Sequence, residues 1–566
     1  MTFANYHATN PLIVQNDLTI LLEIDSPQAS GARSAIAPFT ELEKSPELIH
    51  TYRITPLSLW SAAAAGLSTT AILDRLHMFA KYPIAETVTD MIGSLVERWG
   101  RLQIKIEDNQ LRFVSDDADL LTQLAHHPEI APLLSSPLGS YGYVVLPINR
   151  GALKQKLMAL DWPIEDLAGY TDGTNCQIAL RTETFNIRDY QGMAAEAFYA
   201  NGTAHGGAGV VVLPPGAGKT VVGIAAMSLV NQSTLILTTN NTSVNQWQRE
   251  LLQKTHLDSE QIARYVGEEK GIAPITVSTY QMLTYRPPQS DIFPHLRLLN
   301  EQHWGLIIYD EVHLLPAPIF RTTAKIQSTR RLGLTATLIR EDGREGDVFA
   351  LIGPKKFEAP WRVLEQAGWI AVAQCIEVRV DLAAEERETY VTAEKRDMYR
   401  IAAENPQKTP LLEAILQRHP HTQTLIIGQY IRQLQQIAQK LNIPLITGKT
   451  PQPEREHLFT AFRKGNINTL VISRVGNFAL DLPDADMLIQ VSGTFGSRQE
   501  EAQRLGRILR PKGDGRQAYF YTLVTRDTRE LEFAHNRQLF LAEQGYSYHI
   551  YDAREFLDKD SINQTL

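Results

Sequence analysis

Cysteine is scarce in this chain: Cys176 and Cys375 are the only two among 566 residues, and they lie far apart. Zinc and iron–sulfur sites built on clustered cysteines are therefore excluded, and the usage is typical of a reducing cytosol. There is no run of roughly eighteen apolar residues, so we expect no membrane span. The start, MTFANYHATNPLIVQ, has no basic segment followed by an apolar one, so we expect a cytoplasmic protein rather than a secreted one.

An excess of positive charge is also absent. The chain has 55 Lys and Arg residues against 63 Asp and Glu residues, a net charge of −8. A protein that coats nucleic acid by charge alone is excluded, so any phosphate contacts must come from a local basic surface and from backbone N–H groups. The length of 566 residues predicts several domains rather than one core.

The first part of the chain predicts a strand pair, PLIVQ and TILLEI, and then three helices from Thr55 onward. The alternating RLQIKI at 101–106 could form the wing of a winged helix, and a plain helical packing domain fits equally well. Residues 107–183 contain one clear strand (141–148) and one helix (150–162), which suggests a small α/β module.

From about residue 185, short apolar strands alternate with amphipathic helices. The first series comprises 210–213, 234–238, 275–279, 306–310 and 331–337, and the second 424–428, 444–448, 469–473, 487–492 and 517–524. Continuous apolar strands between helices indicate parallel sheets covered on both faces. The sequence therefore predicts an α/β protein with two tandem parallel-sheet domains after a smaller N-terminal region.

A phosphate-binding loop is predicted between the strand VVVL and the helix TVVGIAAMSLV. Glycines there let backbone N–H groups approach a phosphate chain, the lysine adds a positive charge, and the Thr220 hydroxyl can bind Mg²⁺. The loop residues are Pro215, Gly216, Ala217, Gly218, Lys219 and Thr220. The general pattern has Gly where this chain has Leu213, but the strand–loop–helix context still favours ATP binding over a solvated turn.

Two acidic residues, Asp310 and Glu311, follow the buried strand LIIY. Ligands of α/β sheets bind at the carboxyl ends of strands. Asp310 is predicted to hold Mg²⁺, and Glu311 to orient and deprotonate the attacking water.

A third group of residues lies in the second α/β series, at QRLGRILR. Arg507 and Arg510 share one face of a helix. They could neutralise the γ-phosphate across a domain cleft as arginine fingers, and the alternative is a basic helix face on DNA or in water.

With these motifs, nearly the whole chain, from about 11 to 550, resembles superfamily 2 helicases of the XPB family. Arg188 and Gln191 resemble the adenine-side motif, and GLTAT (333–337) resembles the motif that couples hydrolysis to domain movement. Arg340, Glu341 and Asp342 match the family's own signature. The resemblance implies nucleic-acid coupling by Thr335, Thr337, Arg340, Glu341, Asp342, Gln503 and Arg504.

The resemblance also implies a division of the chain. The expected parts are an N-terminal XPB-like domain (1–106), a module in the place of the damage-recognition domain (107–183), RecA-like motor domain 1 (184–375), a thumb-like segment (376–410) and RecA-like motor domain 2 (411–566). Each motor domain brings its own sheet, so we expect a chain without residues 1–183 to fold.

The implied activity is ATP-dependent 3′→5′ DNA unwinding with ATP and Mg²⁺, in DNA repair or transcription-linked processes. The expected partners are DNA at single-strand–duplex junctions and a nuclease or repair protein, with no membrane, in a nucleoid-associated cytoplasmic protein of prokaryotic type. Two alternatives stay open, a duplex-DNA-binding protein or translocase that uses ATP without separating strands and an RNA-remodelling helicase, and ATPase rates with different nucleic acids discriminate them.

Overall fold

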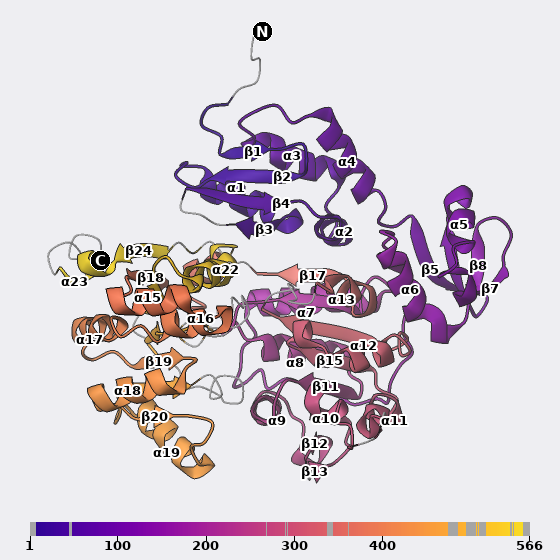
Figure 1. Ribbon diagram of the computed structural model, residues 1–566. Coiled ribbons are helices and arrows are strands. Elements are labelled where there is room, and N and C mark those ends of the chain that lie inside the picture. Colours follow the sequence, from indigo (N-terminus) through magenta and orange to yellow (C-terminus); the bar gives the residue numbers. More distant parts are fainter. Residues whose placement is uncertain are drawn as a thin grey trace, which may run out of the picture. The chain divides into compact units, whose positions relative to one another are not determined.

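The computed structural model describes residues 7–44, 48–267, 269–288, 290, 292–336, 343–359, 361–473, 485–493, 505, 506, 508, 517–543, 546 and 548–558. These residues form four sheets (Figure 1). The chain divides into two compact units, Met1–Leu213 with Gly218–Ala359 and Pro214–Ala217 with Pro360–Leu566. Among the described helices no single one could span a membrane, although α2 and α3 together, bent by 116°, pass by length and composition.

The N-terminal domain has an antiparallel sheet of order β1-β2-β4-β3, which confirms the predicted strand pair. Its strands are β1 (Leu12–Val14), β2 (Thr19–Glu23), β3 (Glu41–Lys44) and β4 (Ile49–Arg53). Its helices are α1 (Ala29–Ile36), α2 (Pro56–Ala64), α3 (Thr69–Phe79) and α4 (Glu86–Val96). The side chains of Thr55 and Ser68 accept hydrogen bonds from the first turns of α2 and α3, which confirms the predicted helix starts.

The second sheet has five strands in the order β7-β8-β6-β5-β9. Its elements are β5 (Leu102–Glu107), β6 (Gln110–Ser115), α5 (Ala118–Ala125), β7 (Leu134–Pro137), β8 (Gly142–Val145), α6 (Arg150–Ala159) and β9 (Glu165–Asp166). Because β5 pairs with β6 in a sheet that contains none of β1 to β4, the interpretation of 101–106 as a wing of the N-terminal domain is wrong. A division at 106/107 would separate paired strands, so we propose to place it before β5.

The third sheet belongs to motor domain 1 and has eight strands in the order β13-β12-β14-β11-β15-β16-β10-β17. The strands are β10 (Ala208–Val212), β11 (Thr234–Thr238), β12 (Ile262–Val266), β13 (Glu269–Lys270), β14 (Ile275–Thr279), β15 (Leu306–Asp310), β16 (Arg330–Thr335) and β17 (Lys355–Glu358). The helices are α7 (Asp189–Tyr199), α8 (Lys219–Val230), α9 (Asn241–Lys254), α10 (Tyr280–Leu283), α11 (Leu298–Glu301), α12 (Ala317–Thr323) and α13 (Glu345–Leu351). The central strands are buried along nearly their whole length, as their apolar runs predict.

The fourth sheet has seven strands in the order β20-β21-β19-β22-β23-β18-β24. The strands are β18 (Ala373–Val380), β19 (Thr424–Gly428), β20 (Leu445–Ile446), β21 (Thr469–Ser473), β22 (Met487–Gln490), β23 (Ala518–Thr525) and β24 (Tyr548–Asp552). The helices are α14 (Trp361–Gln366), α15 (Ala384–Thr392), α16 (Lys395–Ala403), α17 (Lys408–Arg418), α18 (Ile431–Leu441), α19 (Gln452–Arg463), α22 (Arg529–Glu543) and α23 (Ala553–Leu557).

The two large sheets repeat one topology. When β13 is set aside, each sheet has seven strands. If these are numbered 1 to 7 along the chain, both sheets show the same permutation in space, 3-4-2-5-6-1-7, from β12 or β20 at one edge to β17 or β24 at the other. Every pairing in that permutation is parallel. The prediction of two tandem RecA-like α/β domains is therefore confirmed. Since β18 begins at Ala373, we propose to move the boundary predicted at 375/376 to about 360, where the two compact units divide.

A buried ion cluster fixes the five-stranded module to motor domain 1. Asp166 Oδ1 lies 2.7 Å from Arg150 Nη2 and its Oδ2 3.0 Å from Lys154 Nζ. Lys154 also donates to Gln327 Oε1 at 2.9 Å, in the loop before β16. Although burial by itself raises the pKa of Asp166, Lys154 and Arg150 outweigh it and hold the pKa far below its usual range. These contacts join the module to the strand that leads to the predicted coupling motif.

Candidate functional site

The predicted phosphate loop connects β10 to α8 as expected. Gly216 and Gly218 have φ values of 82° and 83°, which favour glycine. A Cβ on Gly218 would also lie 2.5 Å from Nε2 of Gln191, so a larger residue would meet the buried amide. Leu213 is fully buried and its N–H bonds to the carbonyl of Thr335 at 3.0 Å, so it extends β10 and lies outside the loop. This explains why the departure at 213 leaves the loop intact.

Gln191 places the predicted adenine-side motif beside this loop. Its Oε1 accepts a hydrogen bond from the N–H of Arg188 at 3.1 Å, and the side chain is 3% exposed. The structure thus brings Gln191 and Gly218 together.

Lys219 and Glu311 meet at the carboxyl edge of the sheet. Lys219 Nζ lies 2.7 Å from Glu311 Oε1, although the two residues come from α8 and from the turn after β15. Glu311 has a left-handed backbone, with φ 53° and ψ 55°, which turns the chain away from β15. Although burial raises the pKa of Glu311, Lys219 and then His313 outweigh it and lower the pKa. Glu311 is therefore held as a carboxylate, the form that a general base needs.

Asp310 is held by two aromatic residues. Its Oδ2 accepts a hydrogen bond from Trp247 Nε1 at 2.9 Å, and its backbone carbonyl accepts one from the Tyr280 hydroxyl at 2.8 Å. Trp247 fits because Gly223 on α8 has no side chain: a Cβ there would lie 2.5 Å from the indole. Trp247 and Tyr280 are both buried, and their contacts orient Asp310.

Burial and then the nearby Glu311 carboxylate raise the pKa of Asp310 to about 6. A divalent cation beside it would favour the ionised form. Among the described residues, no group of three or more His, Cys, Asp or Glu side chains could hold a metal. A magnesium ion at Asp310 and Thr220 would therefore take its other ligands from phosphate oxygens and water, which suits Mg²⁺.

His313 links the acidic turn to the next strand. Its Nδ1 lies 2.7 Å from Thr335 Oγ1, and both side chains are buried. Nδ1 is also 3.5 Å from Glu311 Oε2. Thr335, predicted from the coupling motif, thus lies one hydrogen bond away from the residue that neighbours Glu311.

The other predicted site residues fall outside the described residues. They are Thr337, Arg340, Glu341, Asp342, Gln503, Arg504, Arg507 and Arg510.

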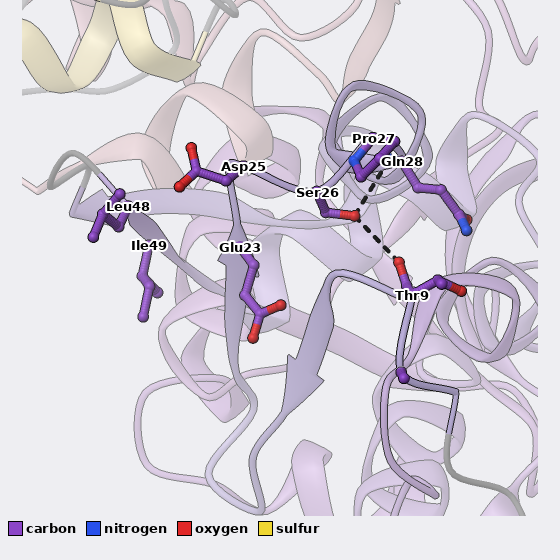
Figure 2. A pocket seen from close by; sticks show the side chains of 9 residues that line it. Thr9, Glu23, Asp25, Ser26, Pro27, Gln28, Leu48 and Ile49 are labelled. Carbon is purple, nitrogen blue, oxygen red and sulfur yellow. Dashed lines mark hydrogen bonds between the residues drawn. The ribbon is translucent and has the colours of Figure 1, made fainter.

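A separate cavity of about 600 Å³ lies on the N-terminal domain (Figure 2). Glu23, Asp25 and Ser26 line its polar side, and Leu48 and Ile49 its apolar side. None of the described residues that line it is basic, so its chemistry does not suit a phosphate chain.

Comparisons with known proteins show that this chain is similar to helicases. A family model described as "ERCC3/RAD25/XPB C-terminal helicase" matches residues 364–565. Two others, "Type III restriction enzyme, res subunit" and "Helicase conserved C-terminal domain", match 184–340 and 12–138.

Curated relatives match over nearly the whole chain. The protein named "DNA 3'-5' helicase XPB" of Mycobacterium tuberculosis is 53% identical over 97% of this chain and 98% of its own length. The protein of the same name in Kineococcus radiotolerans is 51% identical over 96% of each. The "General transcription and DNA repair factor IIH helicase/translocase subunit XPB/SSL2" of Saccharomyces cerevisiae is 34% identical over 96% of this chain and 72% of its own length.

Proposed function

This chain belongs to the XPB family of superfamily 2 helicases, and from that premise we propose that it is an ATP-dependent DNA 3′–5′ helicase. The observation that carries the proposal is the placement of Lys219, Glu311 and Asp310 at one edge of the first motor sheet. A lysine for phosphate, a carboxylate for water and a second carboxylate for Mg²⁺ are the groups that phosphoryl transfer to water requires.

In the proposed reaction, the backbone N–H groups of Gly216 to Thr220 bind the phosphates, and Lys219 leaves Glu311 to contact the β- and γ-phosphates. Glu311, released from that pair, accepts a proton from the attacking water. Thr220 and Asp310 would hold Mg²⁺, which neutralises phosphate charge when bound. Arg507 and Arg510 are proposed to add positive charge at the γ-phosphate.

The hydrogen bond between His313 and Thr335 supports a role for Thr335 in coupling. A change of charge at Glu311 alters the surroundings of His313, and Thr335 ends the strand that leads to Thr337 and to Arg340, Glu341 and Asp342. We propose that these residues, together with Gln503 and Arg504, couple ATP hydrolysis to movement on nucleic acid. The partner we propose is DNA with a single-strand–duplex junction, met at the nucleoid, with a nuclease or repair protein as a second partner.

The test compares ATP hydrolysis without nucleic acid and with single-stranded DNA, duplex DNA or RNA, together with unwinding of 3′-tailed and 5′-tailed duplexes. The proposal expects stimulation by DNA and unwinding of the 3′-tailed duplex alone. Stimulation by RNA only would identify an RNA-remodelling enzyme. DNA-stimulated hydrolysis without strand separation would identify a translocase, and ATP-dependent DNA binding without turnover would identify a switch.

A further inference from the structure

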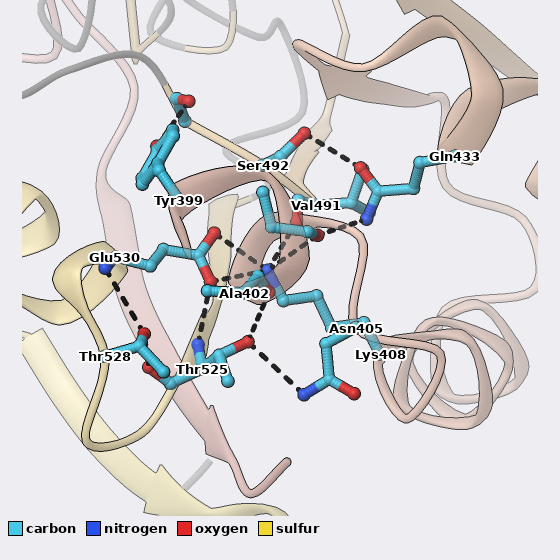
Figure 3. A network of polar contacts seen from close by, with 12 residues as sticks. Tyr399, Ala402, Asn405, Lys408, Gln433, Val491, Ser492, Thr525, Thr528 and Glu530 are labelled. Carbon is cyan, nitrogen blue, oxygen red and sulfur yellow. Dashed lines mark hydrogen bonds and ion pairs between the residues drawn. The ribbon is translucent and has the colours of Figure 1, made fainter. Parts of the chain in front are cut away.

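Three consecutive residues directly after β22 are each held by a side chain from a different helix (Figure 3). Lys408 of α17 donates to the carbonyl of Val491 at 2.9 Å. Gln433 of α18 accepts a hydrogen bond from the Ser492 hydroxyl at 2.9 Å. The Tyr399 hydroxyl of α16 donates to the carbonyl of Gly493 at 2.6 Å. The end of this strand is therefore fixed residue by residue.

Lys408 forms a buried ion pair with Glu530. Both side chains are 1% exposed, and Lys408 Nζ lies 2.8 Å from each carboxylate oxygen of Glu530. The ammonium also donates to the carbonyl of Ala403 at 3.2 Å, and Glu530 Oε2 accepts from the N–H of Thr525 at 2.9 Å. Apolar residues of the same volume often stabilise a core as well as a buried pair does. What the pair adds is a cation at a defined position beneath Val491.

The helical hairpin α15–α16, predicted as a thumb-like segment, takes part in the same network. Thr525 Oγ1 donates to the carbonyl of Ala402 at 2.6 Å, and Gln433 Nε2 donates to that of Ala403 at 2.7 Å. The Tyr399 ring packs edge-on against Phe533 of α22, with centroids 5.1 Å apart. The hairpin is thus joined to the end of β22 by buried polar contacts.

We propose that Tyr399 and the Lys408–Glu530 pair are positioning residues for ATP hydrolysis. The network fixes Gly493, and in the sequence Gly493 precedes Arg507 and Arg510. The inference rests on the proposed function, in which these arginines contact the γ-phosphate. A positioning group acts on the transition state more than on ATP binding, so its loss should lower kcat and leave KM for ATP nearly unchanged.

The test is Tyr399→Phe, which removes one hydroxyl and keeps the ring against Phe533. We expect kcat for DNA-stimulated ATP hydrolysis to fall by about tenfold, the effect of roughly 1.4 kcal/mol in the barrier, with KM within about twofold. The matched control is Tyr390→Phe in the same hairpin. The Tyr390 hydroxyl accepts a hydrogen bond from the N–H of Arg529 on α22, whereas the Tyr399 hydroxyl donates one to Gly493. Tyr390→Phe should keep its kcat.

A second variant, Lys408→Met with Glu530→Gln, removes both charges together and should also lower kcat. If Tyr399→Phe keeps a normal kcat, or if Tyr390→Phe loses as much, the positioning role is overturned while the helicase proposal stands. If the unaltered protein fails to hydrolyse ATP with any nucleic acid, the proposed function is overturned, and the positioning role with it.

Discussion

The pairing of Lys219 with Glu311 keeps the predicted base occupied until a phosphate chain attracts the lysine. The ion pair has a distance of 2.7 Å, and the Lys219 and Glu311 side chains are 13% and 18% exposed. A bound γ-phosphate would attract Lys219 more strongly than Glu311 does. When Lys219 moves to the phosphate, the Glu311 carboxylate is left free to contact water. We propose that the resting contact and the catalytic role use the same two residues in turn.

Glu311→Gln should abolish ATP turnover and keep ATP binding. Glutamine keeps the shape of the side chain but is not a base, so we expect kcat to fall by at least about a hundredfold. Lys219→Ala should lose ATP binding as well, because it removes the phosphate contact. Nucleotide-binding titrations beside steady-state rates separate the two variants. Near-normal turnover by Glu311→Gln would show that another group activates the water.

Asp166→Asn should destabilise the protein in a pH-dependent way. The folded-state pKa of Asp166 is lowered, so its ionised form contributes stability that is fully present above the unfolded pKa near 4 and is lost as pH falls through the folded value. Removing the carboxylate leaves Arg150 and Lys154 buried without their anion. We expect this to lower the free energy of unfolding by about 3 kcal/mol. Urea unfolding should show a difference at about pH 5 to 6 that shrinks below about pH 4. The comparison is made in this range because burial lowers the pKa of Lys154 to about 8, so the charge of the cluster also changes at higher pH.

The control for that measurement is Asp172→Asn. Asp172 also pairs with an arginine, Arg330 at 3.3 Å, but its side chain is 75% exposed. Solvent screens such a pair, so the variant should unfold close to the unaltered protein at every pH. Equal effects of the two substitutions would mean that burial of the cluster contributes nothing.

Sequence patterns predicted which residues lie at the phosphate edge, because strand–loop–helix motifs fix those positions locally. They did not predict the role of Trp247, although Val244, Trp247 and Leu251 recur on one face of α9 and are all buried. That spacing indicates a buried tryptophan. Which carboxylate the indole contacts depends on how α9 packs on α8, and this is a tertiary property.

At the scale of elements, the apolar runs predicted most strands of both motor sheets, but they missed β12 and β18, which lie inside their sheets. The edge strands β17 and β24 were also not predicted, because their sequences, KKFE and YHIYD, are only partly buried and show no continuous apolar run. The sheet to which β5 belongs was not predicted either, since alternation predicts a strand but not which sheet it joins. The repeated topology of the two motor sheets emerges only when strands without a sequence signal are included.

Helix α6 contacts motor domain 1 through a glycine. A Cβ on Gly151 would lie 2.3 Å from the carbonyl oxygen of Ala324, which belongs to the backbone and cannot turn aside. Gly151→Ala should therefore push α6 away from Ala324 and strain the ion cluster formed by Arg150 and Lys154. We expect a loss of about 1–3 kcal/mol, read as a lower urea midpoint.

Gly346→Ala on the neighbouring helix α13 is the matched control. There a Cβ would meet only Met158 Cγ at 3.5 Å, an ordinary contact. Alanine also favours a helix over glycine, so this variant should be as stable as the unaltered protein or more so. If Gly151→Ala behaves in the same way, α6 is not packed closely on Ala324.

At the scale of the whole molecule, the segment between the five-stranded module and α7 makes hydrogen bonds to motor domain 1. The N–H of Cys176 bonds to the carbonyl of Asn231 at 3.2 Å, and Arg181 Nε donates to that of Thr255 at 2.6 Å. The Tyr170 ring lies 5.7 Å from the guanidinium of Arg331, which is fully buried. The module and this segment therefore complete the packing of the first motor sheet.

These contacts argue against the expectation, drawn from the sequence, that a chain without residues 1–183 folds. Such a chain would expose Arg331 and leave the backbone groups of Asn231 and Thr255 without their partners. It should be insoluble or bind a hydrophobic dye, whereas a chain that begins at Glu97 keeps the module, Trp99 and the ion cluster, and should remain folded with ATPase activity. Trp99 is retained because its ring packs edge-on against Phe349 at 5.7 Å. Solubility, dye binding and ATP hydrolysis of the two chains decide the matter, and a well-folded, active chain from residue 184 would show that motor domain 1 is complete without the module.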